Sequence, residues 1–230
     1  MAHLLKLEIR KFRLPRKMIT AFLAVAFCML FITVSLVDSM ADPEQTKDTF
    51  ESTFLVIGLL VSLVFLIYSS ILTSTLVINE YSQRTITILF SYPLNKRLLI
   101  AIKMMLIMAF TAISILFGYV CCCGYIIGMD HAFDMLEGSF QTAYLSQWVA
   151  MAVTSAIVCG ILSWWPFVIG MIRKSVPATI VTSLIVLFAR QLIITKTPAN
   201  QENLFQVVFM LMVTLAAVTI VFREKVTKID

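Results

Sequence analysis

Long uncharged stretches alternate along the chain with short polar segments. Six of these stretches hold at most one charged residue each, and a helix needs about 20 apolar residues to cross a bilayer. We therefore predict six transmembrane helices, at residues 19–37, 53–78, 99–129, 145–171, 175–195 and 203–222. Because backbone polar groups inside a membrane must pair within the protein, the pattern predicts an all-α integral membrane fold.

The composition also indicates a membrane protein. Of the 230 residues, 60% are hydrophobic and 13% are charged, and the mean hydropathy is +0.95. Soluble domains are about 45–50% apolar and about 25% charged. Six spans and their loops leave no room for a sizeable domain outside the bilayer, so we expect a single transmembrane domain over residues 1–230.

The positions of the charges predict the topology. If both termini lie in the cytoplasm, 15 of the 18 Lys and Arg residues fall on the cytoplasmic side and nine of the 13 Asp and Glu residues fall outside. This is the distribution that the positive-inside rule describes. The net charge of +5 therefore reflects topology, and we expect the lipid membrane, and no nucleic acid, as a partner.

The start of the chain also resembles a signal peptide, with Ser39, Met40 and Ala41 as a small-residue cleavage site. The uncharged run at 19–37 is 19 residues long, whereas the apolar part of a signal peptide has about 7–15 residues. We therefore interpret residues 19–37 as the first span.

Residues 1–17 predict an amphipathic helix on the membrane surface. Four basic residues recur there at helical spacing, namely Lys6, Arg10, Arg13 and Lys17. Leu5, Ile9 and Phe12 lie opposite them, and Pro15 breaks the register. Such a helix lies along the headgroups, where its basic face is attracted to anionic lipid. A disordered basic tail is the alternative.

A second patterned segment connects the second and third spans. Ile86, Leu89 and Phe90 fall on one helical face, and Glu80 can pair with Arg84 four residues later. A proline restricts the residue before it, so the helix ends at Tyr92-Pro93. We predict a short cytoplasmic helix at 79–92. The alternative is a loop that only reverses the chain at the headgroup surface.

This segment resembles the cytoplasmic coupling segment of ABC-2 type transporter permeases. The matching residues are Glu80, Tyr81, Arg84, Thr85, Leu89, Ser91, Pro93, Lys96, Arg97 and Lys103. Many members of the family carry a glycine before the threonine, where this chain has Arg84. That variant resembles small permeases linked to antimicrobial-peptide export or immunity.

The resemblance implies the fold of a type V ABC exporter in a bacterial plasma membrane. Two permease subunits, identical or different, would pair with two cytoplasmic ABC ATPase subunits, which bind the ATP and Mg. The chain would then export an amphiphilic substrate, such as an antimicrobial or toxic peptide or a lipid-like molecule. The residues implied to contact the ATPase are Glu80, Tyr81, Arg84, Thr85, Leu89, Phe90 and Pro93.

The sequence carries no pattern typical of an enzyme. It has no G-x-x-x-x-G-K-[ST], H-E-x-x-H or G-x-S-x-G motif, and its two histidines, His3 and His131, lie outside the spans on opposite sides. All five cysteines fall in apolar spans. We expect no catalytic, cofactor-binding or metal site in this chain. The alternative function is a non-transporting scaffold or sensor subunit that docks a cytoplasmic partner.

A few polar side chains interrupt the spans and are candidates for the pathway or its gate. They are Ser70, Thr73 and Ser74 in the second span and Arg190 in the fifth. Two alternatives stay open. The hydroxyls can bond to a carbonyl one turn back or to a neighbouring helix, and Arg190 can extend its guanidinium to the membrane surface instead of pairing with an acid such as Glu202.

Aromatic residues mark two places in the fourth span. Trp148, with Tyr144, is typical of the aromatic belt at a membrane surface. Trp164, Trp165 and Pro166 predict a bulky, kinked region.

Overall fold

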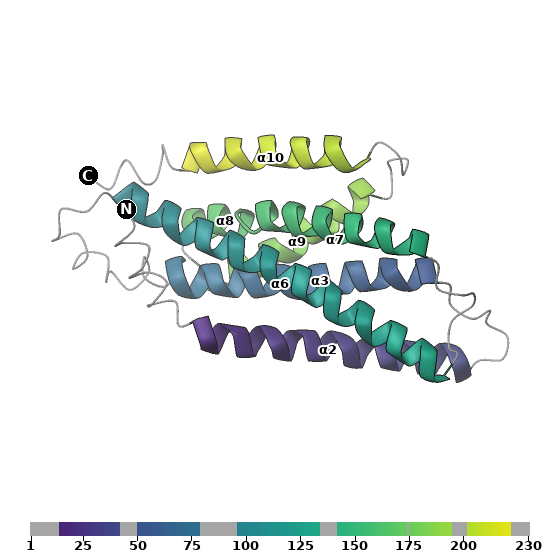
Figure 1. The fold of residues 1–230 in the computed structure, drawn as a ribbon. Coiled ribbons are helices and arrows are strands. Elements are labelled where there is room, and N and C mark those ends of the chain that lie inside the picture. Colours follow the sequence, from purple (N-terminus) through teal and green to yellow (C-terminus); the bar gives the residue numbers. More distant parts are fainter. Residues whose placement is uncertain are drawn as a thin grey trace. The chain divides into compact units, whose positions relative to one another are not determined.

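Every element that the structure describes is a helix (Figure 1). The computed structural model describes residues 14–41, 50–78, 96–133, 142–173, 175–194 and 202–221. Its helices are α2 (Leu14–Ala41), α3 (Phe50–Thr73), the π-helix η1 (Ser74–Ile78), α6 (Lys96–Phe133), α7 (Thr142–Leu162), α8 (Trp165–Arg173), α9 (Val176–Ile194) and α10 (Glu202–Val221). The predicted all-α membrane class is confirmed.

Four helical stretches are long and apolar enough to cross a membrane. Within the described residues these are Lys17–Val37, Thr53–Ile78, Leu99–Phe133 and Trp148–Arg173. The last two expected spans hold the shorter apolar stretches Val176–Gln191 and Val208–Ile220. Residues 1–13 of the predicted surface helix and all of the predicted helix at 79–92 lie outside the described residues.

The first span begins earlier than the uncharged run alone suggests. Helix α2 starts at Leu14, with Pro15 in its first turn. Proline is well tolerated there, because the first amide groups of a helix have no partner within it and the ring already fixes a helical φ.

The described residues group into two compact units. The first unit contains Leu14 and the described parts of 66–112 and 157–230, and the second unit contains those of 15–65 and 113–156. Helices α2, α3, α6 and α7 contribute residues to both units.

Aromatic packing forms the core of the second unit. The ring of Trp148 lies 5.4 Å from that of Phe54 and 5.6 Å from that of Tyr119, and the Tyr119 hydroxyl donates to the Ser155 hydroxyl at 3.1 Å. Trp148 is only 6% exposed. The expectation that Trp148 belongs to an aromatic belt is therefore wrong, because its indole packs inward on these two rings.

Two glycines allow α3 and α6 to approach closely in the second unit. A Cβ atom at Gly58 would lie 2.8 Å from the Tyr119 hydroxyl oxygen, and one at Gly118 would lie 3.0 Å from the Phe65 ring. Larger residues at either position would collide with the aromatic side chain opposite.

The predicted kink is present between α7 and α8. Pro166 cannot donate a backbone hydrogen bond, and its ring clashes with the carbonyl four residues earlier, that of Leu162, where α7 ends. The Trp164 amide instead donates to the Ile161 carbonyl at 3.2 Å, a tighter three-residue bond. Helix α8 begins directly afterwards at Trp165.

Helix α8 packs against α9, η1 and α10 in the first unit. The closest approach is at Gly170, where an added Cβ atom would overlap Thr179 of α9 and lie 2.8 Å from the Ile78 side chain of η1. Thr179 is held in place, because its hydroxyl donates to the Val176 carbonyl at 2.6 Å. The three elements can meet only because residue 170 has no side chain.

We predict that Gly170→Ala is less stable than the matched variant Gly124→Ala. Both changes add one methyl group to a helix and gain the same intrinsic helix propensity, about 1 kcal/mol. A Cβ atom at Gly124 meets no atom within 4 Å, so only Gly170→Ala is overpacked, by about 1–3 kcal/mol. Thermal unfolding of the two purified variants in detergent measures the difference, and equal midpoints would contradict this packing.

Candidate functional site

The residues that flank the predicted coupling segment meet in one apolar cluster of the first unit. Helix η1 ends at Ile78, directly before the predicted helix at 79–92, and α6 begins at Lys96, four residues after the end of that helix. We call this cluster the junction core; it consists of Leu72, Val77, Ile78, Ile100, Met104, Ile107, Phe167, Val168 and Met171. The elements on both sides of the segment therefore pack in a single core that also includes α8.

Lys103 links the two flanking elements by a direct hydrogen bond. The side chain is 6% exposed, and its Nζ donates to the Leu76 carbonyl oxygen of η1 at 3.2 Å. The last carbonyls of a helix have no partner within it, and a positive charge at that end is favourable. Lys103 of α6 therefore caps the helix that precedes the segment.

The π-helix η1 gives the end of the second span an unusual geometry. A π turn closes its hydrogen bonds over five residues instead of four, is rare, and is frequent at functional sites. The Ser74 hydroxyl oxygen in this turn is buried and has no hydrogen-bond partner among the described residues. Because the turn is wider than an α-turn, η1 alters the direction in which the chain leaves α3 towards residue 79.

Two of the three candidate pathway hydroxyls, those of Ser70 and Thr73, form hydrogen bonds within the helices, whereas that of Ser74 has none among the described residues. Ser70 donates to the Ile67 carbonyl at 2.7 Å, and Thr73 donates to the Ser69 carbonyl at 2.9 Å. Ser183 of α9 also approaches Ser70, with 3.4 Å between the two hydroxyl oxygens. Ser70, Thr73 and Ser74 are all buried. These are the bonds that the packing alternative predicts.

Arg190 lies four residues before the end of α9. Its side chain is 8% exposed, so the guanidinium is packed against the chain and does not project from the helix end. The side chain of Glu202, its suggested partner, lies outside the described residues.

The predicted ATPase contacts lie outside the part of the chain that the structure describes. They are Glu80, Tyr81, Arg84, Thr85, Leu89, Phe90 and Pro93. The structure adds residues that the sequence did not single out for this region, namely Gly170 and the acceptor of Lys103. Lys103 itself was visible in the sequence as a charge inside an apolar span, but its partner depends on the packing of α6 against η1.

Comparison with known proteins agrees with the resemblance of the coupling segment. A family model described as "ABC-2 family transporter protein" matches residues 4–190 of the chain. The chain is also similar to the uncharacterized protein YcbO of Bacillus subtilis (strain 168), with 28% identity over 184 residues, which cover 80% of this chain and 81% of YcbO. No solved structure matches the chain at a significant level.

We predict that Lys103→Met loosens η1. The substitution keeps an unbranched side chain but removes the donor of the bond to the Leu76 carbonyl. An acceptor that loses its hydrogen bond inside a protein lowers the stability by about 1–3 kcal/mol. Amide hydrogen exchange in η1 should therefore be about tenfold faster than in the unaltered chain. Lys103→Arg, which keeps a cationic donor, is the control and should exchange more slowly than Lys103→Met. Equal exchange in all three proteins would show that the bond does not hold η1.

Proposed function

The chain belongs to the ABC-2 family of transporter proteins, and from this membership we propose that it is the permease subunit of an ATP-driven ABC exporter. It is a multi-pass membrane protein, and members of this family are membrane transport subunits that are not themselves catalytic. The family implies a separate ABC ATPase as a partner. In this proposal that ATPase binds ATP and Mg and supplies the free energy for transport.

The junction core is the observation that carries the proposal. The predicted coupling segment leaves η1 at Ile78 and re-enters the described chain at Lys96. Both flanking elements are joined by the bond from Lys103 to the Leu76 carbonyl and by shared packing with α8. A force applied to the segment therefore acts on η1, α6 and α8 together, as a lever between an ATPase and the membrane helices requires.

The coupling segment supplies the contacts with the ATPase in this proposal. The apolar face with Leu89 and Phe90 enters a groove on the partner, as an amphipathic helix does when it binds a protein. Glu80 and Arg84 orient the helix at the rim of the groove. When the ATPase pair closes on nucleotide, the segment moves and displaces the spans through the junction core.

We propose an amphiphilic substrate, with an antimicrobial or toxic peptide as the first candidate. The acidic residues of the loops expected outside, such as Asp42 and Glu44, would attract a cationic peptide. Two permease subunits form the pathway, in a bacterial plasma membrane and with both termini in the cytoplasm. The charge distribution along the chain supports this orientation.

We predict that Phe90→Ala weakens binding of the ATPase. A large buried side chain at an interface often contributes at least about 2 kcal/mol, so the dissociation constant of the permease–ATPase complex should rise about 30-fold. Ile88→Ala is the matched control, since Ile88 lies on the opposite side of the predicted helix. Titration of the purified ATPase against the reconstituted permease measures both constants.

Two outcomes would contradict the proposal, one in that titration and one in the rate of ATP hydrolysis measured on the same complex. If no ABC ATPase binds the chain, the permease function fails. If an ATPase binds but its hydrolysis rate does not respond to the permease or to Phe90→Ala, the chain is a docking scaffold or sensor that does not transport.

We predict that cells lacking this chain become more sensitive to amphiphilic cationic peptides. Re-expression with the partner ATPase should raise the inhibitory peptide concentration at least fourfold, as expected of an exporter that removes the peptide from the membrane. An ATPase variant that cannot hydrolyse ATP is the control and should give no protection. Equal protection by this control would exclude ATP-driven export of the peptide.

A further inference from the structure

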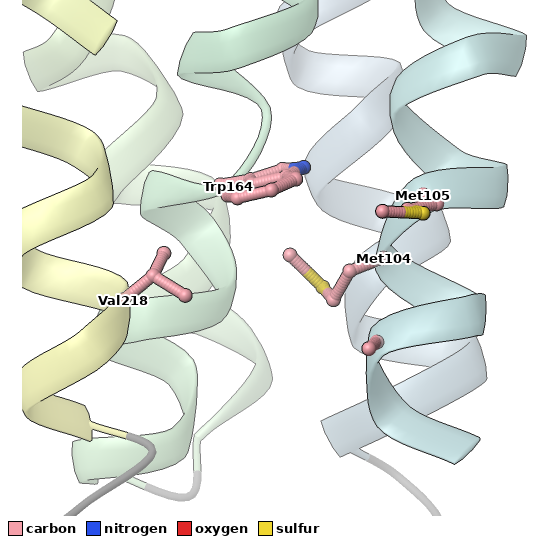
Figure 2. Close-up of a pocket in the computed structure, with 5 residues that line it drawn as sticks. Met104, Met105, Trp164 and Val218 are labelled. Atoms are coloured by element: carbon pink, nitrogen blue, oxygen red, sulfur yellow. The ribbon is translucent and has the colours of Figure 1, made fainter. Parts of the chain in front are cut away.

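A small apolar cavity lies beside the junction core. It has a volume of about 120 Å³ and is lined by Ala101, Met104, Met105, Trp164 and Val218. Figure 2 shows the indole of Trp164 along one side, with Val218 directed into the space from α10 and Met104 from α6. Three segments that are far apart in the sequence therefore enclose one cavity within the first unit.

The cavity borders the apolar outer surface of the helices. Met105 is 63% exposed, although it lies in a stretch of α6 that is apolar enough to cross a membrane. In a bilayer such a surface meets acyl chains. Methionine side chains are flexible and polarisable and adapt to irregular apolar ligands, so the lining suits a hydrocarbon chain.

The size of the cavity limits its occupant. An apolar cavity of about 150 Å³ is large enough for benzene, so 120 Å³ admits a short run of methylene groups but not a folded peptide. This favours a lipid tail over the peptide substrate proposed above.

One positive residue lies in register with the cavity along α6. Arg97 precedes Ala101 by four residues, and Met104 and Met105 follow by three and four, so the backbone places all of them on one helix face. Arg97 is about 6 Å nearer the start of the helix than Ala101, since each residue advances an α-helix by about 1.5 Å. Lys96 is the first residue of α6. A ligand with an apolar tail in the cavity would thus have its head at the basic end of α6.

We propose that this cavity binds an acyl chain of an anionic phospholipid, whose phosphate is attracted by Lys96 and Arg97 at the start of α6. The lipid would lie between α6 and α10, next to the helix that receives the coupling segment. This site is independent of the proposed exporter function, because it requires only that the chain is embedded in a bilayer.

Quenching of Trp164 by brominated lipids tests the proposal. Trp148→Phe combined with Trp165→Phe leaves Trp164 as the single tryptophan of the three. This variant is reconstituted into phosphatidylcholine vesicles that contain increasing fractions of phosphatidylglycerol brominated along its acyl chain. We expect the brominated phosphatidylglycerol to bind at least threefold more strongly than brominated phosphatidylcholine, since each basic residue near the surface attracts anionic lipid.

Three further variants, made in this single-tryptophan background, separate the cavity from the bilayer in general. Arg97→Gln should reduce the preference for phosphatidylglycerol. Ala101→Phe should fill the cavity and reduce quenching by at least half. Val120→Phe adds a bulky ring at an exposed position of α6 that is 19 residues away from Ala101 and should leave quenching unchanged.

Several results would overturn the proposal. Equal quenching by the two lipids would indicate ordinary boundary lipid, and absence of quenching would indicate that another protein chain covers the cavity. Relief of the quenching by an equimolar unbrominated fatty acid would assign the site to free acids. If the double tryptophan variant does not fold, native mass spectrometry of the unaltered chain compares the retention of phosphatidylglycerol and phosphatidylcholine instead. Equal retention of the two lipids, both by the unaltered chain and by Arg97→Gln, would also overturn the proposal.

Discussion

One buried ammonium group determines how the junction core is assembled. The side chain of Lys103 is only 6% exposed, and a charge inside a membrane protein is expensive unless it finds a polar partner. The Leu76 carbonyl is one such partner, and it is available because it belongs to the last turn of the second span. Their hydrogen bond links the end of one span to the beginning of the next.

The helices themselves follow from the uncharged runs of the sequence. A bilayer leaves the backbone few alternatives to a helix, so the length of each run predicts an element. The expected limits at 53–78 coincide with the stretch Thr53–Ile78, and Pro166 correctly predicts the break after Leu162. The family could also be predicted from the sequence, because the residues that carry the resemblance lie close together in the chain, and the family model confirms it.

The contacts between helices could not be read from the same pattern. Trp148 resembles a residue of a membrane surface but packs on Phe54 and Tyr119. The special position of Gly170 appears only when α8, α9 and η1 are assembled. Nothing local distinguishes the π turn at Ser74–Ile78 from a continued α-helix, because its residues are ordinary members of an apolar run. Each of these features depends on which helix lies opposite.

The combination of an apolar core and a charged hydrogen bond suits the coupling role that we propose for this region. Apolar contacts are individually weak and have no preferred direction, so a small shift costs little at each contact. The hydrogen bond from Lys103 to Leu76 is different, since its strength depends steeply on distance and angle. Sliding of η1 along α6 would break this bond and leave the Lys103 ammonium group without that acceptor. Movement of η1 and α6 as one body would preserve the bond. Displacement of the segment between them is thereby passed to both helices together.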